Sequence, residues 1–422
     1  MNNEQKSFRP LVSSWLSFSE RLASRTSLKW LILVLLPVIV LLRYPVEQFD
    51  YDMWWQMALG KYYLMHHTMT VDHSIFSWTP ANPGWIYNTW LGSIIIYFIY
   101  HFCGGFGLWI LQWLVFLSLF LFICSFFRVI RQPLDVTGIT LIAALALTSA
   151  NSCSYYKPEL FSITLSCLLG VISLYVKITR RTFLLYLYPL IFVIWVNLHG
   201  GFIFGFCFLA CFFFGELLNI IFFSRESFAL TITEFVHLGI ACCLALAATL
   251  LNPYGFDYLL NIYHGLTSEA YDLNSTYIQA YVPLWTYFKN IGNNDLIFFN
   301  MGVTFWIMIV MMSFQICLLL HEFITRRTVD FTGLIVNVAT FWASMRATRT
   351  NYMFPLMFFF TFYYQLYHMK IQRITAKATI FSLIVFVVLF FNTAYFTLRY
   401  GVDNKWFGSG LDSFAPVEEV AF

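Results

Sequence analysis

Twelve apolar segments follow one another along this 422-residue chain. A helix satisfies its backbone polar groups within its own segment, as lipid demands, and needs about 20 apolar residues to cross a bilayer. The chain is 60% hydrophobic and only 11% charged, whereas soluble proteins carry roughly 25% charged residues. We therefore predict an all-α polytopic membrane protein, with apolar segments near 30–42, 85–102, 105–127, 136–152, 160–176, 182–198, 201–223, 236–251, 296–321, 332–345, 351–368 and 378–398.

The basic residues between these segments predict their orientation. If all twelve segments crossed the membrane, basic loops would face both sides, against the preference of Lys and Arg for the cytoplasmic side. The segment 85–102 is polar and aromatic enough to lie in the membrane interface instead. Without it, 16 of the 24 Lys and Arg residues, including Lys177, fall in loops or tails on one side. We expect about 11 transmembrane helices, with the N-terminus inside and the C-terminus outside.

This topology predicts the organisation of the chain. The expected parts are a basic cytoplasmic N-terminus, a transmembrane domain and an outer tail, at residues 1–28, 29–398 and 399–422. The long outer loops are 43–104, with amphipathic surface helices expected at 51–66 and 85–102, and 252–295. Long loops often carry functional sites. The net charge of +3 is too small to indicate a nucleic-acid partner.

Asp50 and Asp52 stand close to the end of the first apolar segment. A carboxylate near a bilayer is costly unless it faces water, protein or a ligand. Each Asp could simply cap the helix that follows or favour its dipole. Each could instead act as a general base, or help to hold a divalent metal ion, Mg or Mn, against a phosphate leaving group. Both residues are therefore candidate catalytic residues and candidate metal ligands.

Further polar residues gather at predicted outer positions. Asp72 stands among three histidines, a group that suits a hydrogen-bonded turn better than a closed zinc site. Glu159 follows Lys157 and a proline, where an acidic residue favours the start of a helix or supplies another functional carboxylate. Arg346 and Arg349 are one helical turn apart. They could snorkel to lipid headgroups or clamp a phosphate, with Lys157 as a third cation.

Asn197 and His199 lie between two apolar segments that almost no loop separates. Gly200 and Gly201 are expected to permit the chain reversal there. Polar side chains at this depth face a protein cavity more readily than lipid. We therefore expect Asn197 and His199 to support a ligand site.

Six motifs mark the outer side of the chain. They are Asp50-Tyr51-Asp52-Met53-Trp54-Trp55, Val71-Asp72-His73-Ser74-Ile75-Phe76-Ser77, Trp85-Ile86-Tyr87-Asn88-Thr89-Trp90-Leu91, Lys157-Pro158-Glu159-Leu160-Phe161-Ser162, Asn197-Leu198-His199-Gly200-Gly201-Phe202 and Asn252-Pro253-Tyr254-Gly255. From about residue 28 onward, the chain resembles through these motifs a group of bacterial membrane proteins akin to the GT-C superfamily of glycosyltransferases. Three positions depart from the group's pattern. Gln56 stands where the group usually has His, Thr89 where it has Glu, and Lys157 where it has Arg.

The resemblance implies a GT-C-like bundle in a bacterial inner membrane that transfers a sugar from a polyprenyl-phosphate-linked donor to an acceptor on the outer side. It also implies that the tail 399–422 is the start of a soluble outer domain. Asp52 would be the general base or a metal ligand. The residues expected to support it are Asp50, Asp72, Glu159, Asn197 and His199, and those expected to bind the donor phosphate are Lys157, Arg346 and Arg349. The partners implied are the donor, membrane lipid and, in a complex, additional protein subunits.

Two alternatives come from other functional classes. The departures at Gln56 and Thr89 favour a scaffold or partner subunit that keeps the architecture without the chemistry. A transporter is a weaker alternative, because the sequence predicts no series of charged residues through the spans.

Overall fold

The protein is a helical multi-pass membrane protein. The computed structural model describes residues 35, 47–48, 51–76, 84–131, 135–153, 156–267, 281–290, 296–371, 376–396 and 410–411. Within this part, four helices are long and apolar enough to cross a membrane, at Trp90–Ile130, Glu159–Thr179, Phe202–Phe223 and Met301–Arg326. Shorter apolar helices occur at Val136–Ala146, Thr182–Leu198, Ile232–Ala248 and Ile380–Phe391. The expected total of eleven spans stays a prediction.

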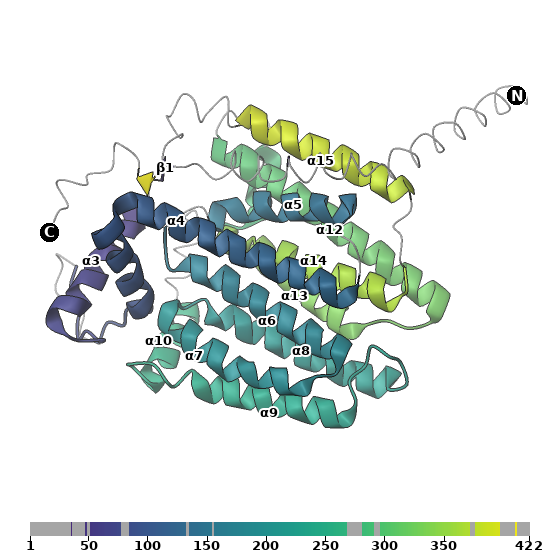
Figure 1. Cartoon of the computed structure of the whole chain (residues 1–422), viewed down its shortest axis with the longest axis horizontal. Helices are drawn as coiled ribbons and strands as arrows, with labels where there is room; N and C mark the ends of the chain where they lie inside the picture. Colours follow the sequence, from purple (N-terminus) through teal and green to yellow (C-terminus); the bar gives the residue numbers. More distant parts are fainter. Residues whose placement is uncertain are drawn as a thin grey trace, which may run out of the picture.

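The helices form one bundle whose long axes run in roughly the same direction (Figure 1). The helices of the bundle after α4 are α5 (Val136–Cys153), α6 (Glu159–Thr179), α7 (Tyr188–Leu198), α8 (Phe202–Phe223), α9 (Ile232–Ala248), α12 (Leu296–Arg326), α13 (Phe331–Arg346), α14 (Met353–His368) and α15 (Ala376–Phe396). Their bounds fall within a few residues of the predicted apolar segments, except that α7 begins six residues late and α12 ends five residues late. A 3₁₀ turn, η1 (Thr182–Leu187), leads into α7.

Helix α3 (Tyr51–His66) and the first part of α4 (Trp90–Ile130) lie at one end of this bundle (Figure 1). Helix α3 packs on this part of α4 so closely that a Cβ on Gly60 would meet the backbone of Ser93. Helix α4 breaks at Gly104, where φ is 60° and ψ is −159°. Only glycine adopts this backbone region without strain. The predicted segments 85–102 and 105–127 are therefore two limbs of one bent element (Figure 1).

The predicted outer loops hold more regular structure than expected. The loop 252–295 contains α10 (Phe256–Thr267) and the 3₁₀ turn η3 (Leu284–Asn290). Near the ends of the chain, β1 (Glu47–Gln48) pairs in parallel with β2 (Gly410–Leu411). The rest of the predicted outer tail lies outside the described residues.

Four helix ends carry a basic residue with left-handed backbone. Arg131, Arg180, Arg327 and Lys370 have φ between 51° and 63°, and they follow α4, α6, α12 and α14. This conformation costs a residue other than glycine roughly 1–2 kcal/mol. A basic side chain at a helix C-terminus offsets part of that cost by meeting the negative end of the dipole. In the predicted topology, all four helices run towards the cytoplasm.

The core contains a charged group that the sequence analysis placed wrongly. Lys177 was expected in an inner loop, but it belongs to α6 and its side chain is 0% exposed. Its Nζ lies 2.5 Å from Oε1 of Glu216 on α8 and 2.9 Å from Oδ1 of Asp330, which caps α13. Asn219 donates a hydrogen bond to Asp330, and Thr332 donates one to Glu216. We call these five residues the Lys177 network.

Candidate functional site

Two ion pairs form beside the start of α6. Lys157 Nζ lies 2.9 Å from Asp52 Oδ2, and Arg349 donates to Glu159 Oε1 over 2.6 Å. Asp52 comes from the first turn of α3, whereas Arg349 comes from the 3₁₀ turn η4 (Thr348–Thr350) between α13 and α14. Together with His199, these residues are the charged cluster. It unites five of the predicted site residues.

The two pairs differ in exposure. The side chain of Asp52 is 59% exposed, whereas those of Glu159 and Arg349 are each 28% exposed. Arg349 is also held from its other side, because it donates to the hydroxyl of Tyr281 over 2.6 Å and lies over that ring. The Glu159–Arg349 pair is therefore the fixed part of the charged cluster, and the Asp52–Lys157 pair lies at its rim.

Asp52 is kept ionised by its neighbours. Partial burial works to raise its pKa, but the hydrogen bond and charge of Lys157 outweigh burial, with help from Trp55 and Arg349. The pKa of Asp52 therefore lies below its ordinary value of 3.8. A carboxylate that is ionised at neutral pH can accept a proton.

His199 is oriented by two hydrogen bonds to Nδ1, from Gly201 and from Ser162. The backbone N–H of Gly201 donates to Nδ1 over 3.1 Å, so this nitrogen is an acceptor. Ser162 Oγ lies 2.7 Å from the same Nδ1 and accepts a hydrogen bond from Trp195, so its own hydroxyl proton is directed to Nδ1. The proton of the neutral ring is therefore on Nε2, 3.9 Å from Glu159 Oε1. His199 offers the cluster an N–H donor.

The pH dependence of folding should report on His199. Burial lowers its pKa to about 4 from an ordinary 6.5; Glu159 opposes this shift, and Arg349 and Lys157 add to it. Between pH 6.5 and pH 4 the unfolded chain therefore binds a proton that the folded chain does not, and stability falls as the pH falls. We expect His199→Asn, which keeps an acceptor for Ser162, to lose less thermal stability than the wild type over this range. Equal losses in detergent-solubilised protein would contradict the assignment.

The glycines beside His199 have a different role from the one expected. Neither Gly200 nor Gly201 has a positive φ. A Cβ on Gly201 would instead lie 2.5 Å from Ser162 Oγ and 2.8 Å from His199 Nδ1, and one on Gly200 would lie 2.8 Å from Asn88 Nδ2. These positions are glycine because other elements approach closely, and not because the chain reversal needs a left-handed backbone.

Asn197 precedes His199 by two residues, and its side chain bonds to residues outside the charged cluster. Its Oδ1 accepts from Trp90 Nε1 over 2.8 Å, and its Nδ2 donates to the carbonyl oxygens of Val193 and Leu251. The side chain thus links α4 and α7 to Leu251, three residues after the end of α9. Its contacts assign Asn197 a positioning role for the chain around His199.

The other predicted residues fall elsewhere. Arg346 is exposed and lies against the ring of Trp342 on its own helix. Asp72 is also exposed, with His73 as its partner. Among the described residues, neither contacts the charged cluster; their partners are Trp342 and His73. Asp50 lies outside the described residues.

The described residues do not form the predicted metal site. Among them, no group of three or more His, Cys, Asp and Glu side chains is placed to hold a metal ion. Asp52 is paired with an ammonium group, which competes with a divalent cation for the same oxygen. The Mg or Mn ion stays a prediction that involves Asp50.

Two departures from the motif pattern touch each other. Gln56 and Thr89, 33 residues apart, are both buried, and the Thr89 hydroxyl donates to Gln56 Oε1 over 2.7 Å. Ser93 donates to the same oxygen. This bond joins α3 to α4 one helical turn from Asp52. Gln56 and Thr89 therefore act as one packing unit that positions α3.

The sequence analysis missed Ser162 and Tyr281. Ser162 follows Glu159 by three residues, so helical periodicity could have placed both on one face of α6. Tyr281 stands in a loop without a motif, and nothing in the sequence singles it out.

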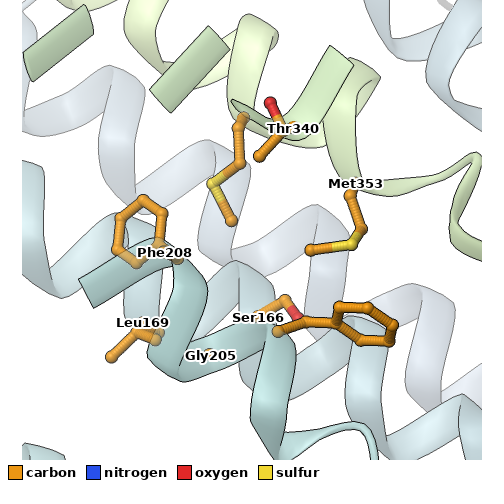
Figure 2. A pocket seen from close by; sticks show the side chains of 8 residues that line it. Ser166, Leu169, Gly205, Phe208, Thr340 and Met353 are labelled. Carbon is orange, nitrogen blue, oxygen red and sulfur yellow. The ribbon is translucent and has the colours of Figure 1, made fainter. Parts of the chain in front are cut away.

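A small cavity lies deeper in the bundle, between α6, α8, α13 and α14. Its free space is about 10 Å³, roughly what one water molecule needs. Figure 2 shows its lining, which is mostly apolar and consists of Ser166, Leu169, Phe204, Gly205, Phe208, Thr340, Met353 and Met357. The cavity is too small for a prenyl unit in this conformation.

No protein-family model matches the chain, and no curated protein matches it.

Proposed function

We propose that the protein transfers a sugar from a polyprenyl-phosphate-linked donor to an acceptor on the outer side of the membrane. The supporting observation is the charged cluster, in which an ionised carboxylate, Asp52, is held close to cations suited to a phosphate, Lys157 and Arg349. A glycosyl transfer of this kind needs both parts. The base activates the acceptor, and the cations stabilise the departing phosphate.

The reaction assigns a role to each group. Asp52 takes the proton of the acceptor hydroxyl while the acceptor oxygen forms a bond to the anomeric carbon of the sugar. The bond from that carbon to the phosphate oxygen breaks, and the lipid phosphate leaves with the bonding electrons. Arg349 and Lys157 stabilise this charge, and the Nε2–H of His199 adds a hydrogen bond.

Arginine substitutions test this assignment, because two arginines three residues apart are placed differently. We expect Arg349→Gln to reduce transfer at least about 100-fold, the order of loss found when one donor to a developing charge is removed. Arg346→Gln, the matched control, should keep transfer within about twofold because Arg346 lies against Trp342. The measurement is sugar transfer by purified protein from a polyprenyl-phosphate-linked sugar in detergent. Equal losses in both variants would contradict the proposed phosphate position.

The alternatives give different results. A scaffold subunit would bind partner chains and show no transfer with any donor. A transporter gains one supporting observation, since the Lys177 network places charged residues inside the bundle, contrary to the sequence expectation. That network is closed on itself through hydrogen bonds, and the cavity between α6, α8, α13 and α14 holds about one water. These features favour a structural role for the network over a transport path.

A further inference from the structure

The two cations of the charged cluster are shared between its two carboxylates. Lys157 contacts Asp52 and its charge also acts on Glu159, while Arg349 contacts Glu159 and its charge also acts on Asp52. An anion that enters between Lys157 and Arg349 must therefore compete with carboxylates for the same donors. The question is which existing pair opens.

Exposure decides this competition. An ion pair with an exposed member contributes little to stability, and the cost of opening a pair rises as its groups are withdrawn from water and gain further hydrogen bonds. The carboxylate of Asp52 is 59% exposed, although its partner Lys157 is 19% exposed. Glu159 and Arg349 are each 28% exposed, and Tyr281 also holds the guanidinium of Arg349. The Asp52–Lys157 pair is the one that opens at low cost.

We propose that the Asp52–Lys157 pair is an exchange switch, in which the phosphate of the lipid-linked donor takes Lys157 and thereby frees Asp52. Arg349 remains on Glu159 and meets the phosphate from the other side. Asp52 keeps its hydrogen bond from Trp55, whose Nε1 lies 3.4 Å from Oδ1, a long and weak contact. This inference rests on the proposed function, because it assumes a phosphate-bearing donor at this site.

The exchange couples donor binding to base strength. Before the donor binds, Lys157 holds the pKa of Asp52 low, which makes this carboxylate a poor proton acceptor. Loss of that hydrogen bond and charge moves the pKa back towards its ordinary value and strengthens the base. The freed carboxylate then takes the acceptor's hydroxyl proton as the sugar–phosphate bond breaks. An acceptor that arrives without a donor meets a base that is still paired.

A double-mutant cycle on binding tests the exchange without requiring catalysis. The probe is farnesyl phosphate, titrated calorimetrically into the full-length protein in detergent, with farnesol as the uncharged control. Asp52→Asn removes the competitor for Lys157 and should tighten farnesyl phosphate binding up to about fivefold, the equivalent of about 1 kcal/mol. Lys157→Gln should weaken it, and adding Asp52→Asn to Lys157→Gln should then have no further effect. Asp257→Asn and Lys61→Gln are matched controls on nearby elements, α10 and α3.

Each outcome of this cycle is decisive. Tightening that needs Lys157 supports the exchange. Tightening of equal size in the Lys157→Gln background would mean that Asp52 merely repels anions, and would overturn the exchange while leaving the proposed function intact. Farnesyl phosphate binding that is weakened by Arg349→Gln but unchanged by Asp52→Asn would also overturn the exchange and leave the proposed function intact. No binding of farnesyl phosphate by any folded variant would overturn the proposed donor together with the exchange.

Discussion

Asp52→Asn should abolish most sugar transfer, with a loss of roughly 10²–10⁴-fold, the contribution that a general base usually makes. An amide cannot take the acceptor's proton, but it has nearly the shape of the carboxylate. Since the Asp52 side chain is 59% exposed and its partner Lys157 is 19% exposed, the substitution should cost little stability. The measurement is the rate of transfer at saturating donor, with the thermal unfolding midpoint as a check on folding.

The control for this variant is Asp257→Asn, an exposed residue in the first turn of α10. Its rate should stay near that of the wild type. If Asp52→Asn kept the wild-type rate in folded protein, Asp52 would not be the base. The exchange proposed above adds a distinctive signature, because the variant should lose rate while it binds the phosphate probe more tightly.

Lys177→Met should be the most damaging single change for stability. The substitution leaves Glu216 and Asp330 buried without their shared cation, and removal of one partner from a buried ion pair costs about 3–5 kcal/mol. The side chains involved are between 0% and 4% exposed, so water cannot compensate the remaining charges. The expected result is a large drop in the unfolding midpoint in detergent, or failure to accumulate as folded protein.

Glu216→Gln is the matched comparison. It leaves one cation with one carboxylate, Lys177 with Asp330, and chiefly weakens the hydrogen bond from the backbone N–H of Leu230. We expect a loss of roughly 1–2 kcal/mol, close to that of one unmade buried hydrogen bond. If Glu216→Gln were as damaging as Lys177→Met, the network would depend on its full charge and not on the shared cation.

The helices were predictable because hydrophobic segments of membrane length are continuous in sequence. The apolar stretches at 136–152 and 201–223 agree closely with α5 (Val136–Cys153) and α8 (Phe202–Phe223). Helix α10 was missed because its apolar residues are interrupted by Asp257 and Asn261, so it does not stand out as an apolar run.

The site was predictable in its members but not in its pairings. Their residue types and their predicted outer positions made Asp52, Lys157, Glu159, His199 and Arg349 candidate site residues. The sequence around each residue does not show which of the others it contacts. Lys157 and Asp52 are 105 residues apart, and Arg349 and Glu159 are 190 apart. Charge counting misplaced Lys177 for the same reason. A lysine near a helix end suggests a loop unless its distant partner, here Asp330, is known.

The basic residues with left-handed backbone at the ends of α4, α6, α12 and α14 each have two effects. Each ends its helix and also influences which way that helix inserts into the membrane. Arg131 and Lys370, for example, end a helix and also carry charge that favours the cytoplasmic side of a membrane. Glycine there would ease the backbone but erase an orientation signal, whereas glutamine would erase the signal and keep the strain. The point where each helix stops and the direction in which it inserts therefore cannot be adjusted independently by one substitution.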